Sequence, residues 1–293
     1  MRYTVPAPIT LGDCLAQLFR EASGRTRKQM LAGGRVRVNG VPVRLPSSML
    51  EAGDVLEIGA KVAPASAVPA GLRIVHEDRE VIVADKPAGL LTIANEHERR
   101  RTAYAYLMSH ARARRPPGRV FIVHRLDRLA SGLLVFATTP DAKEALQGQF
   151  RAHTTERTYL AVVEGTMARG EGTIRTRLLD VEPGPVRETR DPARGRPAVT
   201  HWRVLRGGVG HTLLEIRLET GRRNQIRVHL AGLGHPIAGD PMYGSETDPF
   251  RRLALHAHVL AFDHPRSGER LRFVSPAPAT FSRLRVASRP ADQ

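Results

Sequence analysis

The first 60 residues carry apolar positions in two different periods. Leu11, Leu15 and Leu18 recur at the spacing of one helix face. The stretch GGRVRVNG at 33–40 alternates Val with polar residues and ends in an Asn-Gly turn, and EAGDVLEIG at 51–59 places a Gly-Asp turn before another alternating run. These patterns predict a small N-terminal α/β module in which helices precede a hairpin.

A segment without apolar periodicity separates this module from the rest of the chain. Residues 61–70, KVAPASAVPA, are small and include prolines, as is typical of linkers. We therefore expect one domain at 1–60, a linker at 61–70 and a larger domain at 71–281. We also expect the tail, 282–293, to be disordered.

Strand patterns dominate the larger domain, and helical segments are interspersed among them. Strands are expected on both sides of an acidic turn at 77–80, and at 120–123, 133–137, 157–165, 200–206 and 212–219. Helices are expected at 102–115, at 140–152 and within TGRRNQIRVHLAGLG, and a hairpin with a mobile loop at 168–200. Because strands and helices do not alternate regularly, we predict an α+β fold around a mixed, mostly antiparallel sheet with flanking helices.

A charged cluster stands between two of the apolar strands. The residues HRLD at 124–127 follow the strand at 120–123 and precede LLVFA at 133–137. Holding an ionised carboxylate beside buried strands costs free energy unless the group has partners. Such a cluster usually has a chemical use, which makes Asp127 a candidate catalytic residue.

The net charge favours a polyanionic partner. The chain has 45 Lys and Arg against 29 Asp and Glu, a formal charge of +16. Genome base composition explains a choice of Arg over Lys, but not this excess over acidic residues. One span without any acidic residue contains Arg99, Arg100, Arg101, Arg112, Arg114, Arg115 and Arg119. RNA or DNA is the expected partner, and an acidic membrane is less favoured because the charges do not follow one long amphipathic helix.

The chain shows no pattern for a membrane or for secretion. No apolar run approaches the roughly 18 residues of a spanning helix, and the first residues lack the charged-then-apolar order of a secretory signal. The single cysteine, Cys14, cannot form an internal disulfide. We expect a cytoplasmic protein.

The segment LAGGRVRVNGVPVRLPSSMLEAGDVLEI at 31–58 resembles the S-four type RNA-binding domain. The resemblance implies a helical pair that presents basic side chains to RNA phosphates. The comparable positions are Arg25, Arg27, Lys28, Arg35 and Arg37. Such contacts would position the RNA backbone rather than read its sequence. The alternative is an incidental basic surface on a small helical hairpin.

Four spaced segments of the larger domain resemble successive motifs of the RluA-type pseudouridine synthases. They are HRLDRLASGLLVFA, RTYLAVVEG, ETGRRNQIRVHLAGLGHPIAGDPMYG and RLALHAHVLAFDHP, in family order, and the resemblance covers residues 71 to about 278. It implies isomerisation of uridine to pseudouridine in RNA on a mixed-sheet fold, without a cofactor or a metal. The S-four type module favours ribosomal RNA over transfer RNA as the substrate.

The same resemblance implies roles for individual residues. Asp127 matches the catalytic carboxylate, Tyr159 the aromatic that stacks on the flipped base, and Arg227 the active-site arginine. Arg125 resembles the arginine that helps displace the uridine, and Leu255 lies where the family supplies an apolar wall. The structural alternatives are a core tyrosine, arginines in ordinary ion pairs and an aspartate that forms a turn.

The chemistry is consistent with a carboxylate at this position. Converting an N-glycosidic into a C-glycosidic bond requires uracil to detach, rotate and reattach through C5, so an enzyme group must hold an intermediate. Asp127 could attack the ribose or the base, or assist proton removal at the ribose, and the sequence leaves these routes open. We expect the guanidinium of Arg227 to lower the pKa of Asp127 and keep the carboxylate ionised.

The chain departs from the family pattern at three places. Leu129-Ala130 stands where an Asp-Thr pair is usual, Arg223-Asn224 replaces Thr-His, and Arg157 replaces a Lys. Because these changes spare Asp127, we expect them to affect substrate choice more than activity.

Competing chemistries have weaker support in the sequence. His256, His258 and His264 form the best candidate metal cluster, but neither cysteines nor an acidic triad accompany them. Cys14 lies on the apolar face of a predicted helix, where it is expected to be core rather than nucleophile.

A dinucleotide-binding site and a serine nucleophile also lack support in the sequence. Gly232 and Gly234 do not follow a strand of a βαβ unit, and no nucleophile-elbow pattern surrounds Ser131 and His124. The remaining alternative to an isomerase is a noncatalytic RNA-binding or ribosome-assembly factor with the same fold.

Overall fold

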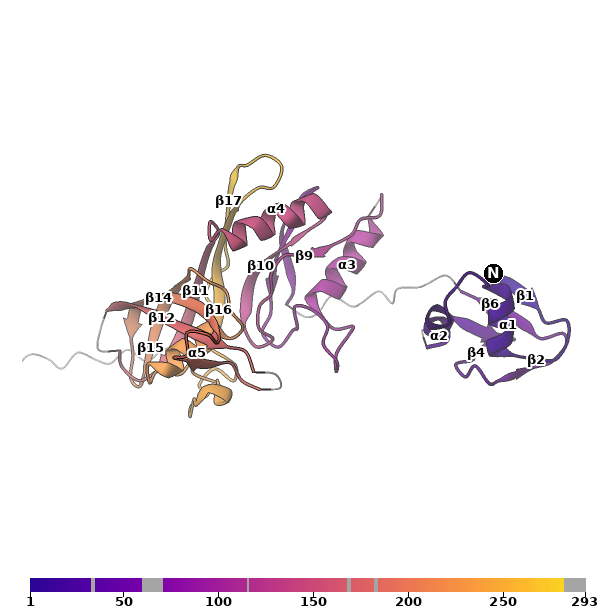
Figure 1. Cartoon of the computed structure of the whole chain (residues 1–293), viewed down its shortest axis with the longest axis horizontal. Coiled ribbons are helices and arrows are strands. Elements are labelled where there is room, and N and C mark those ends of the chain that lie inside the picture. Colours follow the sequence, from indigo (N-terminus) through magenta and orange to yellow (C-terminus); the bar gives the residue numbers. More distant parts are fainter. Residues whose placement is uncertain (33–34, 60–70, 115, 168–169, 182–183, 282–293) are drawn as a thin grey trace, which may run out of the picture. The chain divides into compact units, whose positions relative to one another are not determined.

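The computed structural model describes residues 1–32, 35–59, 71–114, 116–167, 170–181 and 184–281. The chain divides into two compact units, Met1–Ala65 and Ser66–Gln293 (Figure 1). Each unit has a hydrophobic core of its own. The expected linker, 61–70, and the expected disordered tail, 282–293, lie outside the described residues.

The N-terminal unit packs two helices against short strands. Its elements are β1 (Arg2–Thr4), β2 (Ile9–Thr10), α1 (Leu11–Leu18), α2 (Gly24–Ala32), β3 (Val36–Val38), β4 (Val41–Pro42), β5 (Met49–Leu50) and β6 (Val55–Ile58). One sheet has the order β1-β6-β3-β4, and β2 pairs with β5. Leu11, Cys14 and Leu15 of α1 are buried in the core. The predicted α/β module is present, with two strands ahead of the helices that the sequence pattern did not indicate.

The Asn-Gly turn fixes the hairpin of β3 and β4. Asn39 and Gly40 both have positive φ, a conformation that these two residue types tolerate well. The Asn39 side chain accepts a hydrogen bond from the backbone of Val55 at 2.9 Å and donates one to Asp54 at 2.7 Å. The turn therefore also holds β6 beside the hairpin.

The larger unit is built on one mixed sheet. Its strands are β7 (Arg73–Glu77), β8 (Val81–Lys86), β9 (Phe121–Ile122), β10 (Ser131–Ala137), β11 (Glu156–Glu164), β12 (Glu171–Leu179), β13 (Arg187–Thr189), β14 (Arg196–Gly207), β15 (His211–Leu218), β16 (Leu255–Asp263) and β17 (Arg270–Val274). The order is β13-β12-β14-β15-β11-β16-β10-β8-β7, with β17 paired to β16 and β9 to β10. Among the described strand pairs, β10 and β16 are parallel and the others antiparallel. The predicted α+β fold with a mixed, mostly antiparallel sheet is confirmed.

Helices cover both faces of the central strands. The helical elements are α3 (Ala103–Ala113), α4 (Pro140–Arg151), α5 (Gln225–Gly232) and the 3-10 helix η1 (Pro241–Tyr243). Successive residues of β8 face opposite sides, so Ile82 shares a core with α3 and Val83 shares one with α4 (Figure 1). Because both faces are covered, β8 and β10 are buried along their whole length, which explains the apolar runs VIVA of β8 and LLVFA of β10.

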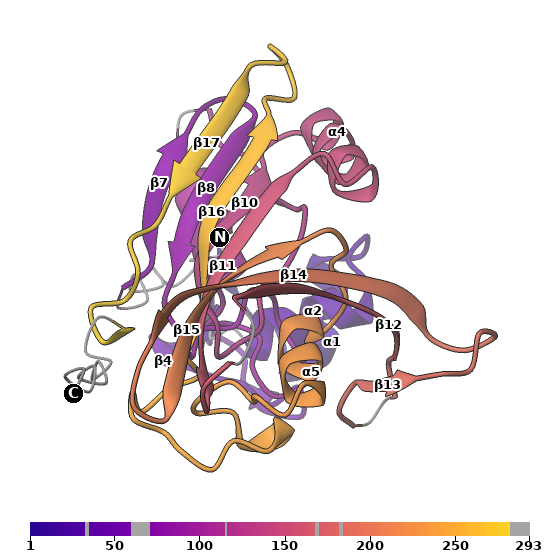
Figure 2. The same ribbon diagram turned by 90° about the vertical axis from the view of Figure 1, so that its left-hand side faces the viewer.

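Helix α5 lies across the strands at the other end of the sheet (Figure 2). His229 of α5 is fully buried and makes hydrogen bonds to Thr176 of β12 at 3.0 Å and to Thr200 of β14 at 2.8 Å. Leu230 packs in the main core, whereas Val228 packs in a smaller cluster with Leu178. The helix that contains Arg227 is therefore fixed on two sides.

The parallel pair β10 and β16 depends on a glycine. Gly132 has a φ of +108°, and a Cβ there would lie 2.2 Å from the backbone oxygen of Ala257. No other residue type allows this approach without a shift of the backbone. Gly132 therefore sets the distance between β10, which follows the HRLD cluster, and β16, which begins at Leu255.

The region 168–200 contains the expected hairpin, formed by β12 and β13, but it also contains more strand than expected. β12 and β14 pair from Glu171 to Leu178, which the sequence pattern did not indicate. The alternation in β12 is only partly apolar, because Arg175 and Arg177 occupy positions between buried Ile174 and Leu178. These arginines interrupt the alternating pattern, so the sequence did not predict the long antiparallel pair of β12 and β14.

Candidate active site

The HRLD cluster lies in the loop that connects β9 to β10. Three contacts hold this loop. Thr92 both donates to the carbonyl of Leu126 at 2.8 Å and accepts from its N–H at 3.1 Å. The ring of His124 accepts a hydrogen bond from the N–H of Val135 at 3.1 Å and stacks on Phe150. Burial lowers the pKa of His124 to about 3, with Arg157 acting in the same direction, so this histidine is neutral and serves as an anchor.

Lys86 is the third anchor of the loop, and sequence reasoning missed its role. Its fully buried ammonium donates to the carbonyls of Arg128 at 3.2 Å and Ala130 at 2.6 Å, beyond Asp127 in the loop, and to those of Pro87 and Leu90. Burial lowers the pKa of Lys86 to about 7, while the nearby negative charge of Asp127 opposes this shift. The Lys-Pro-Ala-Gly sequence signalled a turn, but not that the lysine turns inward.

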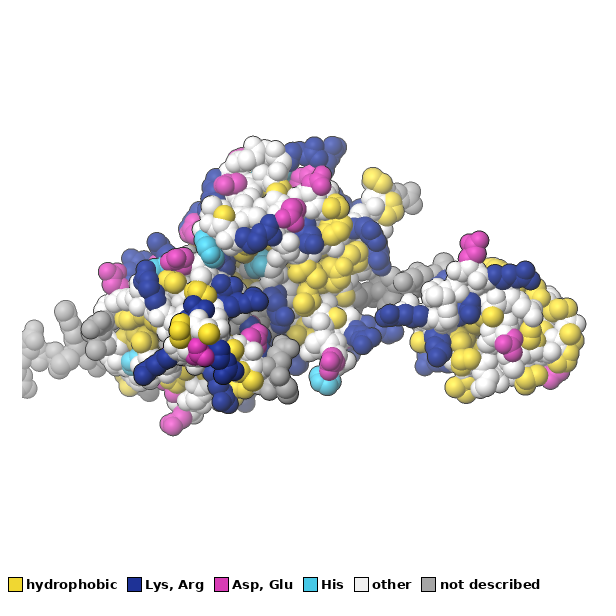
Figure 3. Space-filling model, viewed as in Figure 1, with side chains coloured by type: hydrophobic (Ala, Val, Ile, Leu, Met, Phe, Trp, Pro, Cys, Tyr) yellow, Lys and Arg dark blue, Asp and Glu magenta, His cyan; other side chains and the backbone are white. Residues whose placement is uncertain are grey.

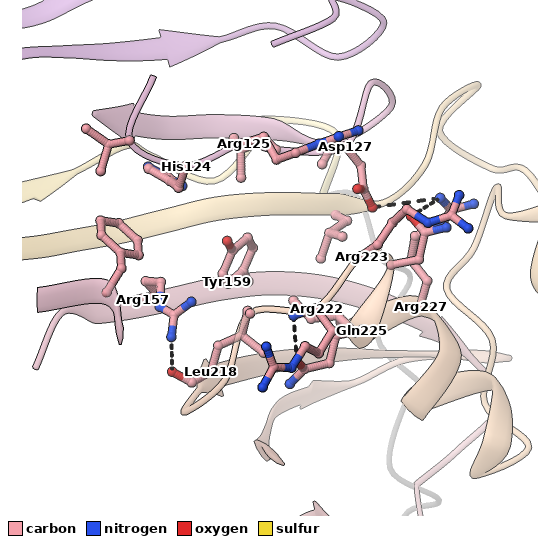
Figure 4. Close-up of a pocket in the computed structure, with 18 of the residues that line it drawn as sticks. His124, Arg125, Asp127, Arg157, Tyr159, Leu218, Arg222, Arg223, Gln225 and Arg227 are labelled. Atoms are coloured by element: carbon pink, nitrogen blue, oxygen red, sulfur yellow. Dashed lines mark hydrogen bonds and ion pairs between the residues drawn. The ribbon is translucent and has the colours of Figure 1, made fainter. Parts of the chain in front are cut away.

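One cavity brings together the five residues that the sequence singled out in the larger unit. The cavity measures about 820 Å³, and its lining includes Arg125, Asp127, Tyr159, Arg227 and Leu255. They come from four segments: the HRLD loop, β11, α5 and the start of β16. Figure 4 shows Asp127 and Arg227 facing each other across this space, with Tyr159 beside them. A concave site lined by many polar and charged side chains, with apolar residues such as Leu255 among them, suits a polar ligand.

Arg227 is positioned mainly by a second carboxylate. Its guanidinium donates to both oxygens of Asp240 at 2.7 Å, whereas its Nη1 lies 3.8 Å from Oδ2 of Asp127. Nη1 also donates to Asn224 at 3.1 Å, and the guanidinium lies 4.8 Å from the ring centre of Tyr243. Because Asp240 is buried and bonds to Arg227 through both oxygens, it is the nearer counter-ion of this arginine.

The pKa of Asp127 is raised, contrary to the sequence expectation. Burial raises this pKa, and the charges of Arg227, Arg125 and Lys86 lower it by less. The expectation that a guanidinium would hold the pKa low was wrong because Arg227 is shared with Asp240 and burial is the larger effect. The side chain of Asp127 keeps 23% of its surface exposed toward the cavity, where a substrate can reach it.

Tyr159 and Leu255 line the cavity from neighbouring strands. Tyr159 pairs with Ala257 of β16 across a local register shift in β11, and burial raises the pKa of its phenol. The phenol therefore stays protonated near neutral pH and can donate a hydrogen bond. Leu255 is a buried apolar side chain at the start of β16, and Arg125 is exposed at the cavity.

The cavity offers the carboxylate of Asp127 beside Arg227 and Tyr159, while the other lining carboxylate, Asp180, pairs with Arg223. Comparisons with known proteins decide the family. A family model described as RNA pseudouridylate synthase matches residues 80–232, and one described as S4 domain matches 15–56. The chain belongs to the RNA pseudouridine synthase family. As a member, it is an enzyme that isomerises uridine in RNA, which confirms the sequence interpretation.

Curated pseudouridine synthases match along most of the chain. One named ribosomal large subunit pseudouridine synthase D, from Xanthomonas campestris, is 38% identical and the match covers 94% of this chain and 87% of its own. An uncharacterized RNA pseudouridine synthase from Bacillus subtilis, YlyB, is 37% identical, with 92% and 91% covered. The solved structure of human RNA pseudouridylate synthase domain containing 4 has a TM-score of 0.59 and 25% identity, covering 71% of this chain and 90% of that one. None of these matches favours a noncatalytic factor.

The turn before α5 is a further part of this pseudouridine synthase that sequence reasoning did not identify. Gln225 makes four hydrogen bonds: it accepts from Thr220 and from the N–H of Arg222, and donates to Val199 and Thr200. The buried amide thereby ties the turn to β14 and orients the helix of Arg227. A glutamine at the first position of a helix carries no such signal in sequence.

Of the residues that depart from the family pattern, Ala130, Arg157, Arg223 and Asn224 line the same cavity. Asn224 has a φ of +52° and its side chain contacts both Arg227 and Tyr243. Arg223 forms an ion pair with Asp180, and Leu129 is exposed. Asn224 thus has a direct part in holding Arg227, which the sequence expectation of an effect on substrate choice alone did not include.

The five basic residues of the N-terminal unit differ in their surroundings. Arg25, Lys28 and Arg37 are exposed. Arg27 donates to the carbonyls of Phe19 and Ala22, and Arg35 donates to that of Gly59 at 3.2 Å. Arg37, although exposed, donates to the carbonyl of Gly40 at 3.3 Å. Arg27, Arg35 and Arg37 therefore already have partners within their own unit.

Other predicted chemistries find no site in the described part of the chain. His256 bonds to Ser131 and His258 to the carbonyl of Ser275, and no cluster of three or more His, Cys, Asp or Glu among the described residues could hold a metal ion. Cys14 is buried, which raises the pKa of its thiol. No helix that the structure describes has the length and apolarity needed to cross a bilayer.

Proposed function

We propose that this pseudouridine synthase acts on large-subunit ribosomal RNA and that Asp127 is its catalytic carboxylate. The observation that carries the catalytic role is the meeting of Asp127, Tyr159 and Arg227 in one cavity, although these residues lie far apart in the sequence. The names of the curated relatives support the substrate, since several are ribosomal large subunit pseudouridine synthases. The site of action is then the cytoplasm.

Asp127 is the accessible carboxylate at the chemical end of the cavity, whereas Asp240 is fully buried and engaged by Arg227. Attack on the ribose or the base needs the ionised form, as does assistance to proton removal at the ribose. The raised pKa makes the carboxylate a stronger base or nucleophile once it is ionised.

The target uridine must leave its stack to reach Asp127, at a cost of a few kcal/mol. Tyr159 offers an aromatic ring for stacking against the base, and Leu255 forms an apolar wall beside it. Arg125 is exposed at the cavity and close enough to Asp127 to influence its pKa, so it is placed to occupy the space that the uridine vacates in the RNA.

We assign residues 1–60 to RNA positioning and 71–281 to catalysis. Within the N-terminal domain, exposed Arg25 and Lys28 are the most available for phosphates. Arg27, Arg35 and Arg37 contribute less to RNA affinity, because each already donates to a backbone carbonyl. The excess of Lys and Arg spread over the larger unit in Figure 3 adds attraction that does not depend on sequence.

The substrate is tested by mapping pseudouridines in ribosomal and transfer RNA from cells that lack the gene. We expect at least one pseudouridine to disappear from large-subunit ribosomal RNA and to return when the gene is restored. A loss confined to transfer RNA would overturn the proposed substrate, while leaving the activity intact.

A further inference from the structure

The cavity extends well beyond the catalytic carboxylate. Figure 4 shows Asp127 and Arg227 at one end and Arg157 at the other, with Tyr159 between them. Both Asp127 and Arg157 influence the pKa of Tyr159, which agrees with this arrangement. About 820 Å³ lies toward the upper end of the range for small-molecule sites, so the space beyond a single uracil is part of the site.

Arg157 is a buried cation that has no carboxylate partner among the residues that the structure describes. Its residue surface is only 8% exposed, and its Nη2 donates to the carbonyls of Leu218 at 3.4 Å and Glu219 at 2.9 Å. The guanidinium lies 5.5 Å from the ring centre of Phe150. Among the described residues, no acidic group lies within ion-pair distance of Arg157, and its Nε has no hydrogen-bond partner.

This lack of a counter-ion separates Arg157 from Arg227. The two arginines are similarly buried and line the same cavity, but Arg227 has the bidentate carboxylate of Asp240. A buried charge is ordinarily paired, because desolvation is otherwise uncompensated. The counter-ion for Arg157 is therefore expected to come from a bound molecule.

The local backbone leaves space for the guanidinium. A Cβ at Gly221 would lie 2.5 Å from Nη1 of Arg157, so a larger residue there would make the guanidinium shift from its present position. Nη1 has no acceptor among the described residues. The cavity as a whole attracts anions, since its lining contains six arginines and two aspartates: Arg125, Arg151, Arg157, Arg222, Arg223, Arg227, Asp127 and Asp180.

We propose that the Arg157 end of the cavity binds a phosphate of the RNA strand next to the target uridine. This inference rests on the proposed function, because the base that reaches Asp127 brings its own flanking phosphates into the cavity. An oxyanion at Nη1 supplies the missing negative charge, and the contact is charge-assisted. Arg157 then positions the nucleotide and takes no part in bond making.

The anion site can be tested without any activity measurement. Inorganic phosphate is titrated into the full-length, nitrogen-15-labelled protein while the Nε–H signals of arginines are followed, and Arg157→Lys assigns the signal of interest. We expect a saturable shift of the Arg157 signal. The control is Arg203, an exposed arginine paired with Glu215 at 3.0 Å, whose signal should show no saturation. An Arg157 signal that behaves like that of Arg203 overturns the proposed site.

The link to RNA is tested with a fragment of the ribosomal RNA that contains the mapped uridine. A neutral methylphosphonate replaces the phosphate on the 5′ side or on the 3′ side of that uridine, one at a time. For one of the two positions, we expect kcat/KM of the wild type to fall about 10- to 100-fold. Arg157→Gln should lower kcat/KM on the natural fragment by a similar factor. For this variant, replacing the same phosphate by the neutral linkage should cause no further fall in kcat/KM.

The combined change separates a phosphate contact from a structural role. If Arg157→Gln and each neutral linkage lower kcat/KM by factors that multiply when the two changes are combined, the proposed contact with RNA is wrong, even if inorganic phosphate binds. Arg157→Lys, which keeps the charge, should regain part of the sensitivity to the linkage and guards against a misfolded Gln variant. Arg203→Gln should remain as sensitive as the wild type. Failure of the wild type to modify any RNA would instead refute the proposed function, and the phosphate titration would still decide the site.

Discussion

Arg227 lies closer to Asp240 than to Asp127: its nitrogens are 2.7 Å from both oxygens of Asp240, and 3.8 Å from the nearer oxygen of Asp127. The arginine is thus held by one carboxylate and presented to another. This division leaves Asp127 with a raised pKa and an open face toward the cavity, while Asp240 is fully buried.

Removing the charge of Asp240 should damage both stability and catalysis. Asp240→Asn leaves the guanidinium of Arg227 buried without its bidentate partner, a loss of about 3–5 kcal/mol in the free energy of unfolding. Urea denaturation measures this change. The control, Asp263→Asn, removes a half-exposed carboxylate paired with Arg270 and should change the free energy by about 1 kcal/mol or less. Equal effects of the two variants would show that Asp240 has no special part in holding Arg227.

Lys86 should be required for the shape of the HRLD loop. Lys86→Met leaves four carbonyls without their donor, including those of Arg128 and Ala130, and we expect a loss of about 3 kcal/mol or more in stability together with a lower kcat. Lys143→Met on α4 is the matched control, with an expected change within about 0.5 kcal/mol. Thermal unfolding and tritium release from labelled RNA provide the two readouts. Unchanged kcat in Lys86→Met would mean that the loop keeps its shape without the lysine.

The raised pKa of Asp127 predicts a particular dependence of stability on pH. A carboxyl whose pKa is higher in the folded than in the unfolded protein favours folding below the unfolded pKa, and loses this contribution as the pH rises through the folded pKa. Asp127→Asn should therefore be more stable than the wild type near neutral pH, and the difference should vanish in acid, where Asp127 is protonated in both states. Chemical denaturation across this range measures the difference. An Asn variant less stable than the wild type at neutral pH would contradict the raised pKa.

The parallel pairing of β10 with β16 should fail when Gly132 gains a side chain. Gly132→Ala places a Cβ 2.2 Å from the oxygen of Ala257 at a φ of +108°, so we expect a loss of about 3 kcal/mol or more. Gly207→Ala, with no heavy atom within 4 Å of the added Cβ, is the control and should be tolerated. Denaturant midpoints compare the two. Similar midpoints would indicate that the strands separate easily.

The central strands and the catalytic motif could be predicted from the sequence, because both depend on residues that are neighbours along the chain. Continuous apolar runs predicted β10 and β11, and HRLD marked the loop of Asp127. The partnership of Arg227 with Asp240 was not predictable in the same way, since nothing in the spacing of these two residues says that the side chains meet. The net pKa of Asp127 depended on that partnership and on burial, so its direction was predicted wrongly.

Other features were hidden because polar residues take on buried roles only in the folded chain. Lys86 and Gln225 look like ordinary polar residues in the sequence, yet both are almost fully buried and satisfied by hydrogen bonds. Arginines on β12 similarly masked a long strand. Tertiary contacts, rather than local propensity, decided each of these cases.

The most direct test of the central role given to Asp127 is tritium release from RNA labelled at C5 of uridine. Bonding of C5 to the ribose requires loss of the hydrogen at C5, so release reports each turnover. We predict release by the wild type, and a rate at least about 100-fold lower for Asp127→Asn in protein shown to be folded. Release by Asp127→Asn at the wild-type rate would contradict the assignment of Asp127 as the catalytic residue.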